Sequence, residues 1–184
     1  MGGRMEYQGI NTDDLANVRA LNRNWLRLTG RNERLADAPF LLFSFRESDT
    51  RLWGRLLGES HQEDLFATRP HIPEGQRDLQ VTGLAFLWEL VRRNPYVARI
   101  VSDAPPGWCE RLSSETVVRV LACARHYDLV VRRFPADAPV YLRRSAHMAT
   151  LQLMLTGIDM AAAGRLPAAA CRSRLPARRV ADKL

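Results

Sequence analysis

"RDLQVTGLAFLWELVRRN", residues 77–94, decides the fold. A helix over these residues is apolar around almost its whole circumference rather than along one stripe. Its apolar residues are Leu84, Phe86, Leu87, Trp88, Leu90 and Val91. Such a helix is stable only when it is buried in a protein core or in an oligomer interface. We therefore predict a central helix from Arg77 to Asn94, with the other elements packed around it.

A second strong helix precedes the central one. The sequence "NTDD" (11–14) supplies capping oxygens and negative charge at the point where a helix begins. Apolar residues then recur at spacings of three and four, which is typical of a helix with one buried face. They are Leu15, Val18, Leu21, Trp25 and Leu28. Gly30 is the predicted end of this helix.

Other segments combine a capping side chain or a proline with a following apolar run, which predicts further helices. We expect them in "TRLWGRLLG" after Asp49, in "PYVARIV" from Pro95, in "ETVVRVLACARHY" after Ser113 or Ser114, and from Tyr141 to Ala163. The aromatic segment "PFLLFSFRE" (39–47) is predicted to be a strand or a buried extended segment, and residues 128–134 are predicted to be extended or the end of a helix. "SDAPPG" (102–107) is predicted to be a loop.

The predicted fold class is all-α: a compact multi-helix domain with one or two short extended segments and a loosely held C-terminal tail. The loop "TRPHIPEGQ" (68–76) contains two prolines and a glycine, so we expect an internal boundary there. The expected regions are an N-terminal helical region (1–76), a C-terminal helical region (77–164) and a basic Pro/Ala/Arg tail (165–184).

The charge composition favours an anionic partner. The net charge is +7 and the pI is near 10.1, as in many proteins that bind nucleic acid. Among the 27 basic residues, however, only Lys183 is a lysine, and a GC-rich genome produces such an arginine excess without selection for binding. No apolar run approaches the roughly 18 residues of a membrane span, and we expect a cytoplasmic bacterial protein without membrane contact.

The sequence contains none of the common catalytic motifs, so we do not expect an enzyme and predict no cofactor. Its three cysteines form no Cys-x-x-Cys pair. Cys123 and His126 are three residues apart on a predicted helix, with Cys109 upstream. A zinc site needs a fourth ligand, which is not evident, and buried structural thiols explain these residues better.

Basic residues gather around the proline turn at 135–139. Arg132 and Arg133 precede the turn, Arg143 and Arg144 open the last predicted helix, and His147 follows one turn later. A turn followed by a helix with basic first turns is the geometry in which recognition helices meet phosphates and base edges. The competing interpretation is a solvated helix face.

Three segments carry a resemblance to a known family: "LAFLWELVRRNP" (84–95), "ERLSSETVVRVLACARHYDLVVRRFPAD" (110–137) and "LQLMLTGIDM" (151–160). Together, residues 84–163 resemble the FlhD subunit of the bacterial flagellar master transcriptional regulator and its mobile-element relatives. Pro135 departs from that family's Phe-Arg-Phe-Asp segment, and Leu155 replaces its usual histidine. The resemblance implies an oligomeric transcription activator that works with a second, zinc-binding FlhC-type subunit on promoter DNA. Thr156 and Ile158 match residues on the family's DNA-binding helix.

The predicted function is therefore that of a DNA-binding transcriptional regulator, an activator subunit that acts as an oligomer or with a partner subunit. The alternative is a helical adaptor or assembly protein of a secretion or conjugation machine. Apolar helices, four tryptophans and an arginine-rich surface would serve an acidic protein partner equally well.

Overall fold

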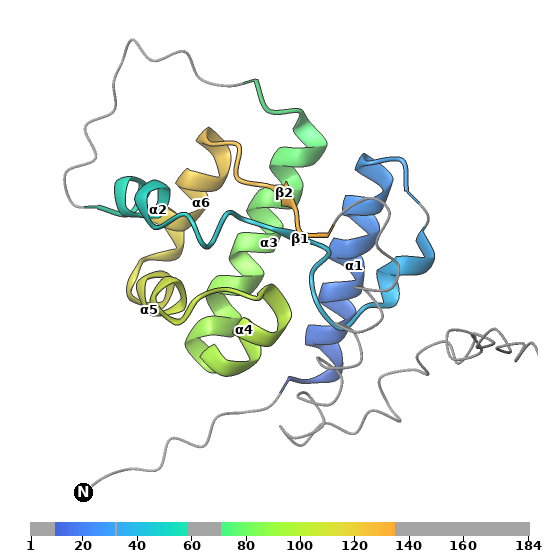
Figure 1. The fold of residues 1–184 in the computed structure, drawn as a ribbon, viewed down its shortest axis with the longest axis horizontal. Coiled ribbons are helices and arrows are strands. Elements are labelled where there is room, and N and C mark those ends of the chain that lie inside the picture. Colours follow the sequence, from blue (N-terminus) through green and yellow to red (C-terminus); the bar gives the residue numbers. More distant parts are fainter. Residues whose placement is uncertain (1–9, 32, 59–70, 135–184) are drawn as a thin grey trace, which may run out of the picture.

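The computed structural model describes residues 10–31, 33–58 and 71–134, which form a mostly helical domain (Figure 1). Its helices are α1 (Thr12–Leu28), α2 (Thr50–Leu56), α3 (Glu74–Arg93), α4 (Pro95–Ser102), α5 (Pro106–Ser114) and α6 (Val117–His126), with a 3₁₀ turn at Glu33–Asp37. Strands β1 (Phe43–Ser44) and β2 (Val131–Arg132) pair antiparallel. The predicted all-α class with short extended segments is confirmed. The predicted last helix and the tail lie outside the described residues.

Helix α3 runs through the middle of the domain and packs against α1, α4, α5 and α6 (Figure 1). Leu79, Leu84 and Leu87 on this helix are fully buried, which confirms its predicted place in the core. Phe86 and Trp88 of the predicted set are half-buried, and Glu89 lies on an exposed side. The helix begins at Glu74, three residues earlier than expected, so residues 74–76 are helical rather than part of a loop. One hydrophobic cluster contains core residues from both sides of position 76, and within the described residues these two regions share a core.

Helix α1 begins with a reciprocal cap. The Asn11 side chain accepts a hydrogen bond from the Asp14 N–H (2.7 Å), and the Asp14 carboxylate accepts one from the Asn11 N–H (2.9 Å). The second Asp14 oxygen pairs with Arg93 of α3 at 2.5 Å, which ties the start of α1 to the end of α3. The inward face ends at Leu26; the predicted Leu28 is 44% exposed.

Helix α5 was not predicted, because Pro105 and Pro106 look like loop residues in the sequence. Pro106 is instead the first residue of the helix, where its fixed backbone angle is favourable and its missing N–H costs nothing. Ser113 and Ser114 end α5 rather than cap the next helix. Their hydroxyls donate back to carbonyls one turn earlier, and Thr116 caps α6.

The buried thiols give a first prediction. Cys109 and Cys123 are buried, and burial raises the pKa of each thiol to about 11. Only the thiolate is nucleophilic, and at pH 8 its fraction is roughly a hundredfold lower than for a thiol at the ordinary pKa of 9.0. We expect iodoacetamide at pH 8 to leave both residues unmodified in the native protein and to alkylate both in urea. Peptide mass spectrometry measures this, and rapid native labelling of either residue would contradict the burial.

Within the described residues, no three His, Cys, Asp or Glu side chains are grouped as metal ligands. The Cys123 thiol donates instead to the Leu56 carbonyl at 3.7 Å. A search of the same residues for a helix long and apolar enough to cross a membrane finds none.

Candidate functional site

Two fully buried amide side chains hold the strands in place. Gln80 of α3 donates to the carbonyls of Ala124 (2.8 Å) and Tyr127 (3.1 Å), and its oxygen accepts from the N–H groups of Leu129 (2.7 Å) and Val130 (3.1 Å). A single side chain thus forms hydrogen bonds with four backbone groups between residues 124 and 130. It fixes the segment that leads from α6 into β2.

Asn22 of α1 holds the segment that leads into β1. Its amide nitrogen donates to the Phe40 carbonyl (2.9 Å), and its oxygen accepts from the Leu42 N–H (2.9 Å). The two-stranded ribbon is therefore anchored from α1 on one strand and from α3 on the other. In this ribbon Phe43 lies opposite Arg132, and Ser44 lies opposite Val131.

The chain turns sharply after β1. Arg46 has a positive φ of 55°, and the Trp53 indole N–H donates to the carbonyls of Phe45 (3.1 Å) and Arg46 (3.2 Å). The Phe45 ring points at Gly83 of α3, where a Cβ would come within 2.6 Å of the ring. The turn leaves Glu47 directed inward, only 4% exposed.

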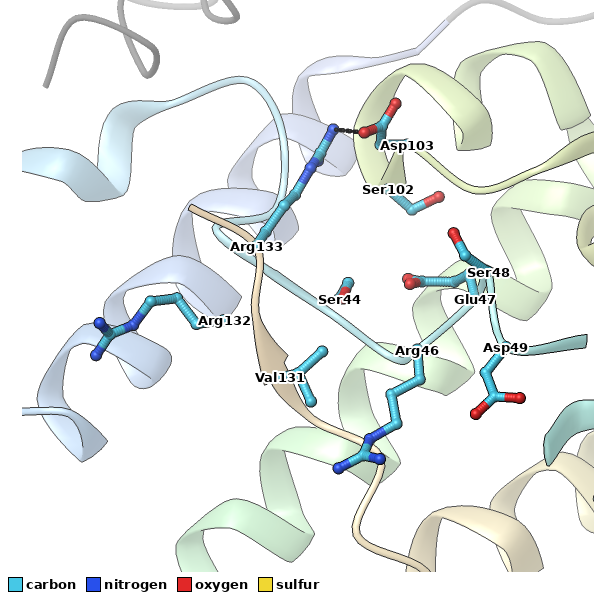
Figure 2. Close-up of a pocket in the computed structure, with 10 residues that line it drawn as sticks. All are labelled: Ser44, Arg46, Glu47, Ser48, Asp49, Ser102, Asp103, Val131, Arg132 and Arg133. Atoms are coloured by element: carbon cyan, nitrogen blue, oxygen red, sulfur yellow. Dashed lines mark ion pairs between the residues drawn. The ribbon is translucent and has the colours of Figure 1, made fainter. Parts of the chain in front are cut away.

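A polar pocket of about 570 Å³ lies between this turn, β2 and the end of α4 (Figure 2). Its lining residues are Ser44, Arg46, Glu47, Ser48, Asp49, Ser102, Asp103, Val131, Arg132 and Arg133. All except Val131 are polar or charged, and arginines and acids are equal in number. This volume lies within the roughly 300 to 1,000 Å³ of most small-molecule sites.

Arg133 forms one wall of the pocket, and its guanidinium is contacted by carbonyls, a carboxylate and an aromatic ring of the protein. Its Nη1 donates to the carbonyls of Leu41 and Val101, each at 3.1 Å, and its Nη2 pairs with the Asp103 carboxylate at 3.3 Å. The guanidinium also lies 5.3 Å from the Phe40 ring centre. Burial lowers the pKa of Arg133, while Asp103 and Glu47 act in the opposite direction. This arginine joins three segments and has little capacity left for a ligand.

Glu47 contributes a buried carboxyl group to the pocket. Its Oε1 is buried and has no hydrogen-bond partner. Burial raises the pKa of Glu47 above its ordinary value of 4.5, while the backbone at Phe45 and at Glu47 and the charge of Arg133 work against that shift. Asp103 adds to the increase. Figure 2 shows the carboxylate directed toward Ser44 and into the pocket.

A second prediction follows from this carboxyl. Because its pKa is raised in the folded state, its contribution to stability is present below pH 4.5 and is lost as the pH rises through the folded pKa. We expect Glu47→Gln to match the wild type near pH 4.5 and to be more stable by about 1 kcal/mol at pH 7.5, since it removes the buried negative charge that Glu47 gains as the pH rises. Urea unfolding at both pH values measures the difference. Glu89→Gln on the exposed side of α3 is the control, and a difference that does not grow with pH would contradict the prediction.

Of the two predicted nucleic-acid-binding arginines in this segment, Arg132 is the last residue of β2 and Arg133 follows the strand, and the two differ in exposure. Arg133 is committed to intramolecular contacts, whereas Arg132 is exposed and points away from Arg133 in Figure 2. Arg132 lies opposite Phe43, whose ring packs 5.6 Å from that of Trp25, so it lies on the α1 side of the ribbon. The other predicted binding residues, Arg143, Arg144, His147, Thr156 and Ile158, lie outside the described residues.

Helix α1 carries a basic row that was not recognised in the sequence. Arg19, Arg23 and Arg27 follow one another at four-residue spacing; Arg23 and Arg27 are exposed and Arg19 is half-buried. Like charges four residues apart destabilise a helix by roughly 0.2 to 0.5 kcal/mol per pair. The spacing is visible in the sequence, but the overall arginine excess hides it.

Comparisons with protein-family models, with curated proteins and with solved structures give no match. The function proposed below therefore rests on the residues themselves.

Proposed function

We propose that the protein is a DNA-binding transcriptional regulator that contacts the phosphate backbone through the arginines of α1. The observation that carries the proposal is the row Arg19, Arg23 and Arg27, which runs along one side of α1. Arginine binds phosphate bidentately, and contacts to phosphates dominate the affinity of proteins for DNA.

Arg132 extends this basic surface on the ribbon, because it lies on the side that packs against α1. Within the proposal, contacts from α1 and Arg132 position the protein, while base reading falls to the predicted helix with Arg143, Arg144 and His147, followed by Thr156 and Ile158. The resemblance to FlhD supports an activator that acts as an oligomer or with a second regulatory subunit.

The test is fluorescence-anisotropy binding to a random DNA duplex over a series of salt concentrations. Removing one arginine that binds a phosphate reduces the slope of log K against log salt by about 0.9. We expect Arg23→Ala/Arg27→Ala to reduce the slope by about 2 and to weaken binding at least tenfold at low salt. Alanine is a strong helix former, so α1 remains intact.

The matched control is Arg51→Ala/Arg125→Ala, which removes the same charge from exposed positions on α2 and α6. This control variant should retain most of the affinity for DNA, because it lowers the net charge of the protein without removing an arginine of α1. Equal weakening by both double variants would mean that no particular surface binds DNA. Arg143→Ala/Arg144→Ala tests the predicted last helix in the same assay.

The alternative of a helical adaptor or assembly protein has its own support in the structure. Tyr96 on α4 is 50% exposed and Val118 on α6 is 75% exposed, which is unusual for large apolar side chains. An interface anchored by such side chains depends little on salt. Partner capture that survives high salt and is abolished in Tyr96→Ala or Val118→Asp would favour this function over DNA binding.

A further inference from the structure

We propose that the polar pocket beside the ribbon binds a small organic ligand through a protonated amine, which donates to Oε1 of Glu47. This site goes beyond the proposed function and holds whether or not the protein binds DNA. It rests on a pocket of about 570 Å³ and on one buried carboxylate oxygen that has no partner.

An unpartnered buried acceptor is rare because it loses its hydration without gaining a hydrogen bond. The cost is tolerated most readily where a ligand completes the interaction. Glu47 fits this case, since it is 4% exposed and Figure 2 shows it directed into the pocket. Ser44 and Ser48 add hydroxyl oxygens to the same lining, and these are acceptors for the further N–H groups of an ammonium.

Three of the other charged residues of the pocket, Asp49, Asp103 and Arg133, already have partners within the protein, which narrows the class of ligand. Asp49 caps α2 through the Leu52 N–H at 2.9 Å, and Asp103 pairs with Arg133 at 3.3 Å. A divalent cation requires several oxygen ligands, and the described residues offer no group of three acidic, histidine or cysteine side chains. An anion would meet the Glu47 carboxylate, while the Arg133 nitrogens already donate to protein oxygens. An ammonium group satisfies Glu47 without displacing any of these contacts.

The proposal predicts a characteristic pH dependence. Glu47 must be ionised to bind an ammonium, and its pKa is raised by burial. The charged groups that face it are Arg133 just after β2 and Asp103 at the end of α4, with Arg46 and Asp49 on its own segment. An aliphatic amine stays protonated up to about pH 10. Affinity should therefore rise with pH as Glu47 loses its proton, and binding below the raised pKa should release a proton.

The experiment uses the full chain and putrescine as the probe, with 1,4-butanediol as its neutral analogue of the same length. Isothermal titration calorimetry at pH 5.5 and pH 7.5 measures affinity, and repetition in buffers of different ionisation enthalpy measures proton release. We expect saturable binding of putrescine that is tighter at pH 7.5 than at pH 5.5, and no binding of the diol.

Two variants test the site. Glu47→Gln keeps the shape of the side chain and should weaken putrescine binding at least tenfold, whereas Glu89→Gln on the exposed side of α3 should not. Val131→Phe fills the pocket from β2 with Glu47 in place, and it should also abolish binding; circular dichroism confirms that each variant is folded. Absence of saturable binding by the wild type, or equal binding by Glu47→Gln, would overturn the proposal.

Discussion

Replacing Gln80 by leucine is expected to lower the free energy of unfolding by about 3 to 5 kcal/mol, the largest effect of any single substitution proposed for this domain. Leucine has a similar volume but cannot form hydrogen bonds. It leaves the N–H groups of Leu129 and Val130 without an acceptor, and the carbonyls of Ala124 and Tyr127 without the Gln80 donor. The free energy of unfolding of a typical domain is only about 5 to 15 kcal/mol, so this substitution would remove about a third of it. Urea unfolding followed by tryptophan fluorescence measures the loss.

Gln76 provides the matched control one turn earlier on α3. Its amide donates to the Asp128 carboxylate at 2.6 Å, but the pair is exposed, so water replaces the hydrogen bond when the side chain is removed. We expect Gln76→Leu to cost less than about 1 kcal/mol. Similar losses for Gln76→Leu and Gln80→Leu would show that Gln80 is not the anchor of β2. The same reasoning applies to Asn22, which anchors the segment before β1.

These two amides also explain why the ribbon could be predicted only in outline. The aromatic segment 39–47 was expected to be extended, and residues 128–134 were expected to be extended or the end of a helix; the structure contains a short strand within each. Their pairing depends on Asn22 and Gln80, which look in the sequence like polar interruptions of amphipathic helices. A buried amide is identified only when its backbone partners are known, and here they lie 18 to 50 residues away.

The central helix, by contrast, could be predicted because its apolar pattern lies within one continuous stretch of sequence. All-round apolarity of residues 77–94 requires burial whatever surrounds it. The helix that begins at Pro106 was missed because two prolines are equally compatible with a loop and with a helix start. Only packing decides between them: Trp108 and Leu112 are buried, and the Trp108 ring meets that of Trp53.

The pocket could not be predicted from any motif. Glu47, Asp103 and Arg133 come from three segments with no regular spacing, and the fold alone brings them together. The different environments of Arg132 and Arg133 also depend on the fold. Arg132 ends β2 and is exposed, whereas Arg133 follows the strand and contacts the Leu41 and Val101 carbonyls and the Asp103 carboxylate.

The pocket also depends on a close approach at Gly83, which leads to the last prediction. In an exposed helix interior, Gly→Ala stabilises by up to about 1 kcal/mol. At Gly83 we expect the reverse, a loss of about 2 kcal/mol, because the new Cβ would lie 2.6 Å from Cζ of the Phe45 ring. Gly54→Ala within α2 is the control, since its nearest neighbour, an Arg111 nitrogen, is at 3.6 Å. It should be neutral or stabilising.

A double-mutant cycle identifies the cause of the loss. Phe45→Leu shortens the side chain that points at Gly83 and should alone cost about 1 to 2 kcal/mol, because leucine fills less of the core than the ring does. If the clash accounts for the effect of Gly83→Ala, the double variant is more stable than the sum of the single losses predicts, by at least about 1 kcal/mol. If the losses of the two single variants simply add in the double variant, contact with Phe45 is not the cause of the loss in Gly83→Ala. Because Phe45 lies two residues before Glu47, Gly83→Ala should also displace the carboxylate from the pocket and weaken putrescine binding, and Phe45→Leu should restore part of that binding.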